Sequence, residues 1–490
     1  MLSDSVAISV PLRSDDETET NINSDPPAYE NPQLDFNGEW KDRGFAIAFW
    51  IHTIAVILVG LTLGIPNLLW SMEESSSDIL GFKCVIYSLI GAAVASGLVS
   101  FLTLFSLQLC AGQLIKCSFL ILIIMQILLT VALYFILPLS CFVPGAFILF
   151  TLIYISCVRN HIAFAEAHLE VGCASLRSQS SLIFVALFML IVEFLWLTLW
   201  CLMCVGVTHV ARINLPSNSI SDHGIMLGFL IGKIVLFLLI LSCYWGAVTF
   251  GNIIHFIAAC TVGDWWFTSD GSGHYGMSNS IKRAFTTNLG TICFGSLFEA
   301  VIKSLRFFTG NGRRKNCLTC IIDYMLQILE KSIGYLNEWA FTFAALTGQG
   351  YIQASRSFIE LFKKRGWTAI VNDSIVGITL MIINLGIGLI SAVVGGTIMH
   401  YMITESSEIT GFVIFIACIS FLIGILMSSI ITTLLKSCVR AVFVCFALNP
   451  AALGATHPEH LQKLTKVWHK FYPQEFASSG YANEFKEPIV

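Results

Sequence analysis

The feature that most constrains this chain is a succession of apolar runs, each close to the length that crosses a lipid bilayer. A hydrocarbon core about 30 Å thick requires roughly 20 residues of α-helix. Ten runs have that character: 44–66, 81–108, 116–137, 139–158, 181–210, 224–262, 284–308, 335–361, 370–400 and 408–437. The sequence therefore predicts an all-α, polytopic transmembrane helical bundle of ten spans, with the lipid bilayer as its main solvent.

Composition supports a membrane protein and argues against several other classes. Hydrophobic residues make up 56% of the 490 residues and charged residues only 12%, about half the share that is usual in soluble domains. The net charge of −4 comes with no basic stripe, so nucleic-acid binding is not expected. Cys317 and Cys320 form a C-x-x-C pair without a second pair, so no metal is expected, and no motif indicates a cofactor.

The polarity of the chain divides it into three parts. Residues 1–43 are acidic and contain several prolines, and such a segment buries too little apolar surface to fold, so we expect a disordered tail. Residues 44–440 form the predicted transmembrane transport domain, and 441–490 form a polar C-terminal tail with a short helix. Lys41 and Arg43 precede the first run, which places the N-terminal tail in the cytosol under the positive-inside rule.

Two other segments carry structural expectations. The stretch 158–180 alternates apolar and acidic residues and is typical of an amphipathic interfacial helix. The eighth run, 335–361, has basic clusters on both sides, so either the run is re-entrant or one cluster is translocated. Small residues around Gly348 and Gly350 favour close helix packing, with a broken helix at this place as the alternative.

One carboxylate lies in the middle of an apolar run and is the main candidate for function. Ionisable groups in hydrocarbon are costly, so Glu193 is either the counter-ion of a cationic substrate, a proton carrier, or a structural hydrogen-bond partner. A quaternary ammonium has no N–H to donate and is held by aromatic ring faces. Trp196 and Trp200 share the helical face of Glu193, and Tyr244 and Trp245 lie in the next long run, so these rings are candidate walls of a cation site.

Other polar residues inside the runs have less specific interpretations. His255 is either a hydrogen-bonded interhelical partner or a proton relay, and Gln349 adds polarity to the stretch around Gly348 and Gly350. Glu299 and Lys303 are four residues apart and are expected to pair within one helix. Glu338 is interpreted as a charge at the start of the eighth helix. The predicted substrate site lies between the fifth, sixth and eighth runs.

Several motifs, in order, resemble those of the choline transporter-like proteins (solute carrier family 44), in their fungal and protist branch. They are Asn252–Phe267 with the sequence NIIHFIAACTVGDWWF, then Leu289–Ser296, Gly348-Gln-Gly350 and Asn449-Pro450. The resemblance implies ten spans, cytosolic N- and C-termini, a plasma-membrane location, and transport of choline or ethanolamine with proton exchange. Asp264 departs from the family pattern, which more often has an uncharged residue there.

The N-terminal tail contains a possible recognition motif of a different kind. Pro26, Pro27 and Tyr29 form P-P-x-Y, which presents a polyproline face and a tyrosine to a WW domain, such as that of a ubiquitin ligase. The alternative function is therefore a non-transporting membrane scaffold or receptor that is regulated through this tail. No catalytic residues are expected, since His457 and His460 lie in a polar tail without a nucleophile or a partnered acid.

Overall fold

The computed structural model describes residues 39–67, 79–136, 142–214, 222–268, 276–310, 317–365, 368–402, 409–471 and 473. Within these ranges all regular structure is helical, which confirms the predicted all-α class. The P-P-x-Y residues Pro26, Pro27 and Tyr29 lie outside the described residues.

The helices follow one another along the chain, most of them long. They are α1 (Arg43–Val59) with the π-helical turn η1 (Gly60–Gly64), α3 (Ile79–Ile136), α4 (Phe142–Val158), the short η3 (Arg159–His161), α5 (Ile162–Ser178), α6 (Ser181–Asn214), α7 (Asp222–Phe267), α8 (Met277–Phe285), α9 (Leu289–Gly310), α10 (Cys317–Thr347), α11 (Tyr351–Arg365), α12 (Thr368–Met402), α13 (Ile409–Leu448), α14 (Pro450–Thr456) and α15 (Pro458–Phe471).

Six helices in the described part are long and apolar enough to cross a membrane. They are Arg43–Asn67, Tyr87–Ser106, Ser181–Thr208, Ile231–Phe267, Ile375–Met402 and Gly411–Leu448. Two bent pairs, Ile148–Cys157 with Ile162–Ser178 and Met277–Phe285 with Leu289–Thr309, raise the number to eight when each counts as one span. The polytopic bundle is therefore confirmed, with six to eight candidate spans by this criterion where ten were predicted.

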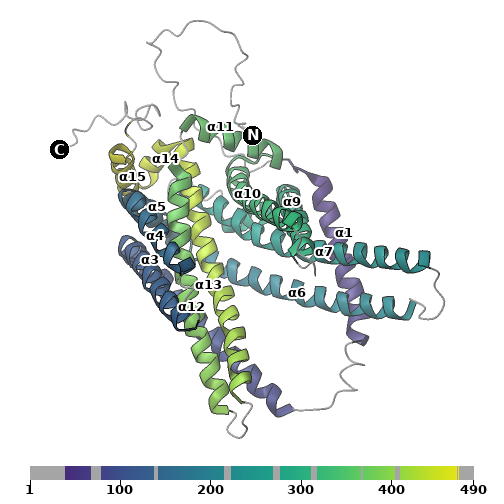
Figure 1. Cartoon of the computed structure of the whole chain (residues 1–490). Helices are drawn as coiled ribbons and strands as arrows, with labels where there is room; N and C mark the ends of the chain where they lie inside the picture. Colours follow the sequence, from purple (N-terminus) through teal and green to yellow (C-terminus); the bar gives the residue numbers. More distant parts are fainter. Residues whose placement is uncertain are drawn as a thin grey trace.

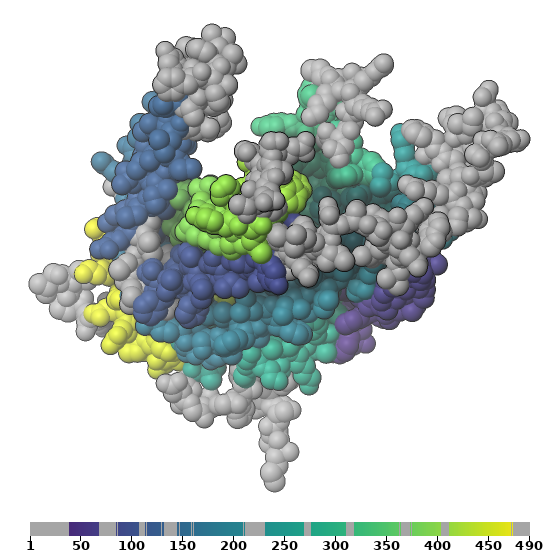
Figure 2. Space-filling view, turned by 90° about the horizontal axis from the view of Figure 1, so that it is seen from below, coloured from purple at the N-terminus to yellow at the C-terminus, as the bar shows by residue number. Residues whose placement is uncertain are grey.

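Two groups of helices share the bundle. The hairpin of α12 and α13 packs on α3, and the view of Figure 2 shows the dark-blue part of α3 beside the lime ends of that hairpin. In the second group α7 packs against α6, α9 and α10, and α13 joins the two groups because it also contacts α7. Figure 1 shows α11, α14 and α15 gathered at one end of the bundle, where α1 also begins.

The second and third predicted runs are one helix in the structure. α3 extends over 58 residues, from Ile79 to Ile136, through the segment 109–115 that separates the two runs. No proline occurs in this stretch, so nothing in it removes a backbone donor from the helical ladder. At 1.5 Å per residue α3 is about 87 Å long, which is far more than a single perpendicular crossing needs.

Two helices, α5 and α13, differ from the sequence expectations. α5, expected at a membrane interface, is instead largely buried in the protein, where it packs against α3, α13 and α15. α5 is buried partly because α15 covers it, and Trp468 of α15 donates its indole N–H to His168 of α5. α13 also continues to Leu448, past the predicted domain boundary at residue 440.

The eighth run is broken, which was the alternative to close helix packing in the sequence analysis. Gly348 has φ 70°, in the left-handed region that glycine adopts without strain, and it separates α10 from α11. α11 then lies across the end of the bundle (Figure 1). The Asp42 carboxylate accepts the backbone N–H of Tyr351 (2.9 Å) and the hydroxyl of Thr291 (3.0 Å), so it caps the first turn of α11. α10 is not among the candidate spans.

Candidate functional site

α7 is the helix that connects the predicted site residues. It packs against α6 on one side and α10 on another, and in Figure 1 it runs between these two helices. Its residues Trp245 and His255 are ten positions apart, about 15 Å along the helix. The predicted site between the fifth, sixth and eighth runs therefore resolves into two clusters, one on each side of α7.

Five aromatic rings form the first of these, which we call the aromatic cluster: Phe49, His52, Trp196, Trp245 and Phe250. The His52 ring stacks on Trp245 at 5.0 Å between centroids and lies 5.4 Å from Trp196. Phe49 meets Trp245 edge-on at 5.4 Å, and Phe250 meets Trp196 edge-on at 5.9 Å. The rings come from α1, α6 and α7, so the cluster is where three helices converge.

Specific contacts hold the rings of the aromatic cluster in place. His52 Nε2 lies 2.7 Å from the Ser242 hydroxyl, and Trp245 donates its indole N–H to the Cys293 carbonyl at 3.1 Å. Trp196 packs flat on Gly246, where a Cβ atom would lie 2.0 Å from the indole. Trp196 is 3% exposed and Trp245 9% exposed. The ring faces are therefore covered by protein in this conformation.

The other residues predicted on this side lie around the cluster. Trp200 is one turn beyond Trp196 and donates its indole N–H to the Leu239 carbonyl at 2.9 Å. Tyr244 is half-buried on α7 and packs against the hydrophobic core. Glu193 is half-buried on α6, one turn before Trp196, and no hydrogen-bond or ion-pair partner of its carboxylate occurs in the described part of the chain.

Four charged residues on the other side of α7 form the ion cluster: Glu338, Asp373, Lys436 and Arg440. Arg440 binds both carboxylate oxygens of Asp373 through two guanidinium nitrogens, each at 2.9 Å, and its third guanidinium nitrogen contacts Glu338. Lys436 lies 3.8 Å from the same Glu338 oxygen. The two cations and two anions balance, which is what allows charges to stay inside a helical bundle.

His255 joins α7 to the ion cluster. Its Nε2 lies 2.5 Å from the Glu338 carbonyl and 3.0 Å from the Thr342 hydroxyl, and its Nδ1 lies 2.5 Å from the Ser437 hydroxyl. Both ring nitrogens are thus hydrogen-bonded across helices, as one of the two interpretations of His255 predicts. Gln349 lies at the helix break and is buried, and the described part of the chain offers its Oε1 no hydrogen-bond partner.

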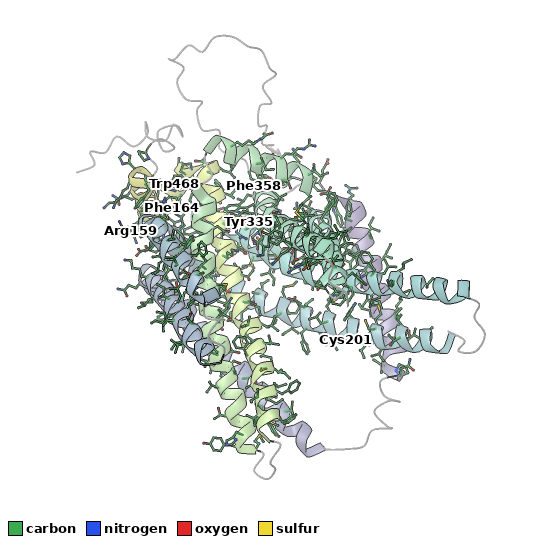
Figure 3. All side chains as sticks on the ribbon, in the orientation of Figure 1. Arg159, Phe164, Cys201, Tyr335, Phe358 and Trp468 are labelled. Carbon is green, nitrogen blue, oxygen red and sulfur yellow. The ribbon has the colours of Figure 1, made fainter. Side chains whose placement is uncertain are left out.

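Aromatic rings line the ion cluster as well. The Arg440 guanidinium lies 5.6 Å from the ring of Tyr335 and 5.7 Å from that of Trp339. Trp339 in turn stacks on Phe358 of α11 at 5.6 Å. Figure 3, which labels Tyr335 and Phe358, shows them on α10 and α11, on the opposite side of α7 from Cys201 of α6.

Sequence reasoning singled out two of the nine residues in the two clusters, Trp196 and Trp245, as site residues. Phe49 and His52 lie in the first run, whose proximity to Trp196 and Trp245 no local pattern reveals. Glu338 was taken for a charge at a helix start, but it lies well inside α10, because that helix begins at Cys317. Lys436 and Arg440 were not singled out, and the last predicted run ended between them, at residue 437. The signal that could have found them is the continuation of apolar residues as far as Leu448.

Comparison with known proteins identifies the family. Residues 142–451, more than half of the chain, match the family model described as plasma-membrane choline transporter. A protein PNS1 of Debaryomyces hansenii is 25% identical over 462 residues, which cover 87% of this chain and 89% of the relative. A protein PNS1 of Kluyveromyces lactis is 24% identical over 492 residues, covering 92% and 84%.

A relative from outside the fungi shows the same likeness. A CTL-like protein of Dictyostelium discoideum is 27% identical over 329 residues, which cover 65% of this chain and 54% of the relative. The segment that matches the family model, residues 142–451, contains both clusters except for Phe49 and His52 of α1. The resemblance noted in the motifs is thereby confirmed, and the chain belongs to the plasma-membrane choline transporter family.

Proposed function

We propose that this protein carries choline or a related small organic cation, such as ethanolamine, across the plasma membrane, with both termini in the cytosol. The observation that carries the proposal is the aromatic cluster, which lies in candidate spans with the Glu193 carboxylate one turn from Trp196. Family membership supports a transporter and argues against an enzyme.

The chemistry of the cluster suits a cation without N–H donors. Each indole face offers an electrostatic attraction of about 0.5–2 kcal/mol to an ammonium, and the value rises as water is excluded. Glu193 supplies the opposite charge, and the described residues leave its carboxylate without a neutralising partner. A bound organic cation would provide that partner inside the membrane, where an isolated charge is costly.

Transport requires the cluster to open, because the faces of Trp196 and Trp245 are covered in this conformation. We propose alternating access, in which α1 separates from α6 and α7 and thereby moves His52 out of its place between the two indoles. Proton exchange, as the second part of the cycle, would use Glu193 or His52. His52 suits this role because its Nδ1 is buried and has no hydrogen-bond partner among the residues that the structure describes.

The test is uptake of radiolabelled choline and ethanolamine by proteoliposomes that contain the purified chain. We expect saturable uptake, and Glu193→Gln should reduce it at least about tenfold, since it removes one full charge from the membrane interior. Glu170→Gln is the matched control, because this carboxylate is exposed on α5 and pairs with Lys463. If neither compound shows saturable uptake, the proposed substrates are excluded. If the two variants reduce uptake equally, the proposed role of Glu193 is excluded.

A further inference from the structure

The ion cluster consists of two unequal pairs. Arg440 and Asp373 are 1% and 4% exposed and make two charge-assisted hydrogen bonds of 2.9 Å. Glu338 and Lys436 are 33% and 29% exposed, and their charged atoms lie 3.8 Å apart, beyond hydrogen-bond distance. Pairs that remain partly solvated contribute little, so Lys436 is the charge that the cluster holds most loosely.

The carboxylate of Glu338 is shared by two cations. A guanidinium nitrogen of Arg440 contacts its Oε2, and the ammonium of Lys436 lies 3.8 Å from the same oxygen. Arg440 also makes the bidentate contact with Asp373, so one guanidinium serves two carboxylates. The ammonium of Lys436 therefore supplies the second positive charge that the two anions require, and it does so from a flexible four-carbon stem.

The surroundings of Glu338 fit an organic cation. The Tyr335 ring lies one turn earlier on α10 and already faces the Arg440 guanidinium at 5.6 Å, so a cation is attracted to this ring. On α12 the Lys436 stem lies beside Gly377, where a Cβ atom would be 3.9 Å from Cε of Lys436. The absence of a side chain at Gly377 leaves the stem room to swing aside.

We infer that Glu338 is a second organic-cation site, at which the ammonium of Lys436 is the resident cation until a substrate displaces it. This inference rests on the proposed function and adds a second binding site, which lies on the other side of α7 from the aromatic cluster. His255 connects the two through α7, because it contacts the Glu338 carbonyl directly. In this arrangement Lys436 competes with the substrate for one carboxylate, as a tethered ligand would.

If Lys436 competes with the substrate for Glu338, removing its ammonium strengthens substrate binding, whereas removing one partner of a purely structural ion pair does not. Removing the ammonium with Lys436→Gln should tighten binding of choline and tetramethylammonium, by about two- to fivefold, because a partly exposed pair of this kind is worth no more than that. Lys436→Arg keeps the competing charge and should leave binding unchanged. Glu338→Gln should weaken binding, and the double variant should bind like Glu338→Gln alone.

The experiment is isothermal titration of both ligands into purified protein in lipid nanodiscs, with thermal stabilisation by tetramethylammonium as a second readout. Lys303→Gln is the matched control, because Lys303 pairs at 2.8 Å with Glu299 within α9 rather than with Glu338. Unchanged or weaker binding by Lys436→Gln, while wild-type protein binds, would overturn this inference and leave the proposed function standing. Wild-type protein that binds neither ligand would overturn both.

Discussion

The buried pair of Arg440 and Asp373 gives the sharpest prediction about stability. Asp373→Asn keeps the shape of the side chain but removes the charge that faces the guanidinium through two hydrogen bonds. Breaking one partner of a buried pair typically costs about 3–5 kcal/mol, because the other charge stays buried. Glu338 still contacts Arg440, so we expect a loss at the lower end, about 3 kcal/mol.

The measurement is the free energy of unfolding from an SDS titration in mixed micelles. Glu330→Gln serves as the control, because it removes one partner of Arg306 from a pair whose members are 20% and 36% exposed. Such a solvent-exposed pair contributes little to stability. If Asp373→Asn and Glu330→Gln lower the free energy of unfolding equally, burial does not set the strength of the Arg440 pair and the reasoning is refuted.

Three further predictions follow from other parts of the molecule. Gly246→Ala places a Cβ 2.0 Å from the Trp196 indole and should cost about 1–3 kcal/mol in the same unfolding assay, whereas Gly251→Ala in the same helix has open space and should cost far less. Burial lowers the pKa of His460 in α15 below its ordinary 6.5, so the folded state resists protonation and loses stability as the pH falls below about 6.5. The protection factors of the α15 amides in hydrogen exchange, corrected for the pH dependence of the intrinsic exchange rate, should be lower at pH 5.5 than at pH 7.5, and His460→Gln should abolish that difference. The N-terminal tail peptide should bind WW domains in a pull-down, and undiminished capture of a Tyr29→Ala peptide would reject the P-P-x-Y motif as a ligand.

Local patterns in the sequence predicted those features that depend on neighbours in the chain. The break at Gly348 was one of two alternatives that small residues in a short stretch indicated, and the pairing of Glu299 with Lys303 followed from a spacing of four on one helix. The choice of Trp196 and Trp245 followed from the chemistry of a cation without donors, and the structure places both in one aromatic cluster. Their role in binding remains a prediction.

Features that depend on partners far along the chain could not be predicted in this way. Lys436 and Arg440 were not singled out from the sequence, because the carboxylates that pair with them lie on α10 and α12, about 60 to 100 residues away in sequence. α5 looked like an interfacial helix because the surface that buries it belongs partly to α15, some 300 residues later. The residues around a charge or an amphipathic face do not specify which distant segment of the chain will pack against it.

By itself the sequence determined the solvent of this protein, its helical class and its family, because apolar runs and ordered motifs are properties of consecutive residues. Only the tertiary structure decided which rings surround His52, which carboxylates neutralise Arg440, and that one predicted site is divided by α7 into two. Those outcomes depend on how helices cross, and helix crossing is set by the summed packing of many side chains, which no single stretch of sequence contains.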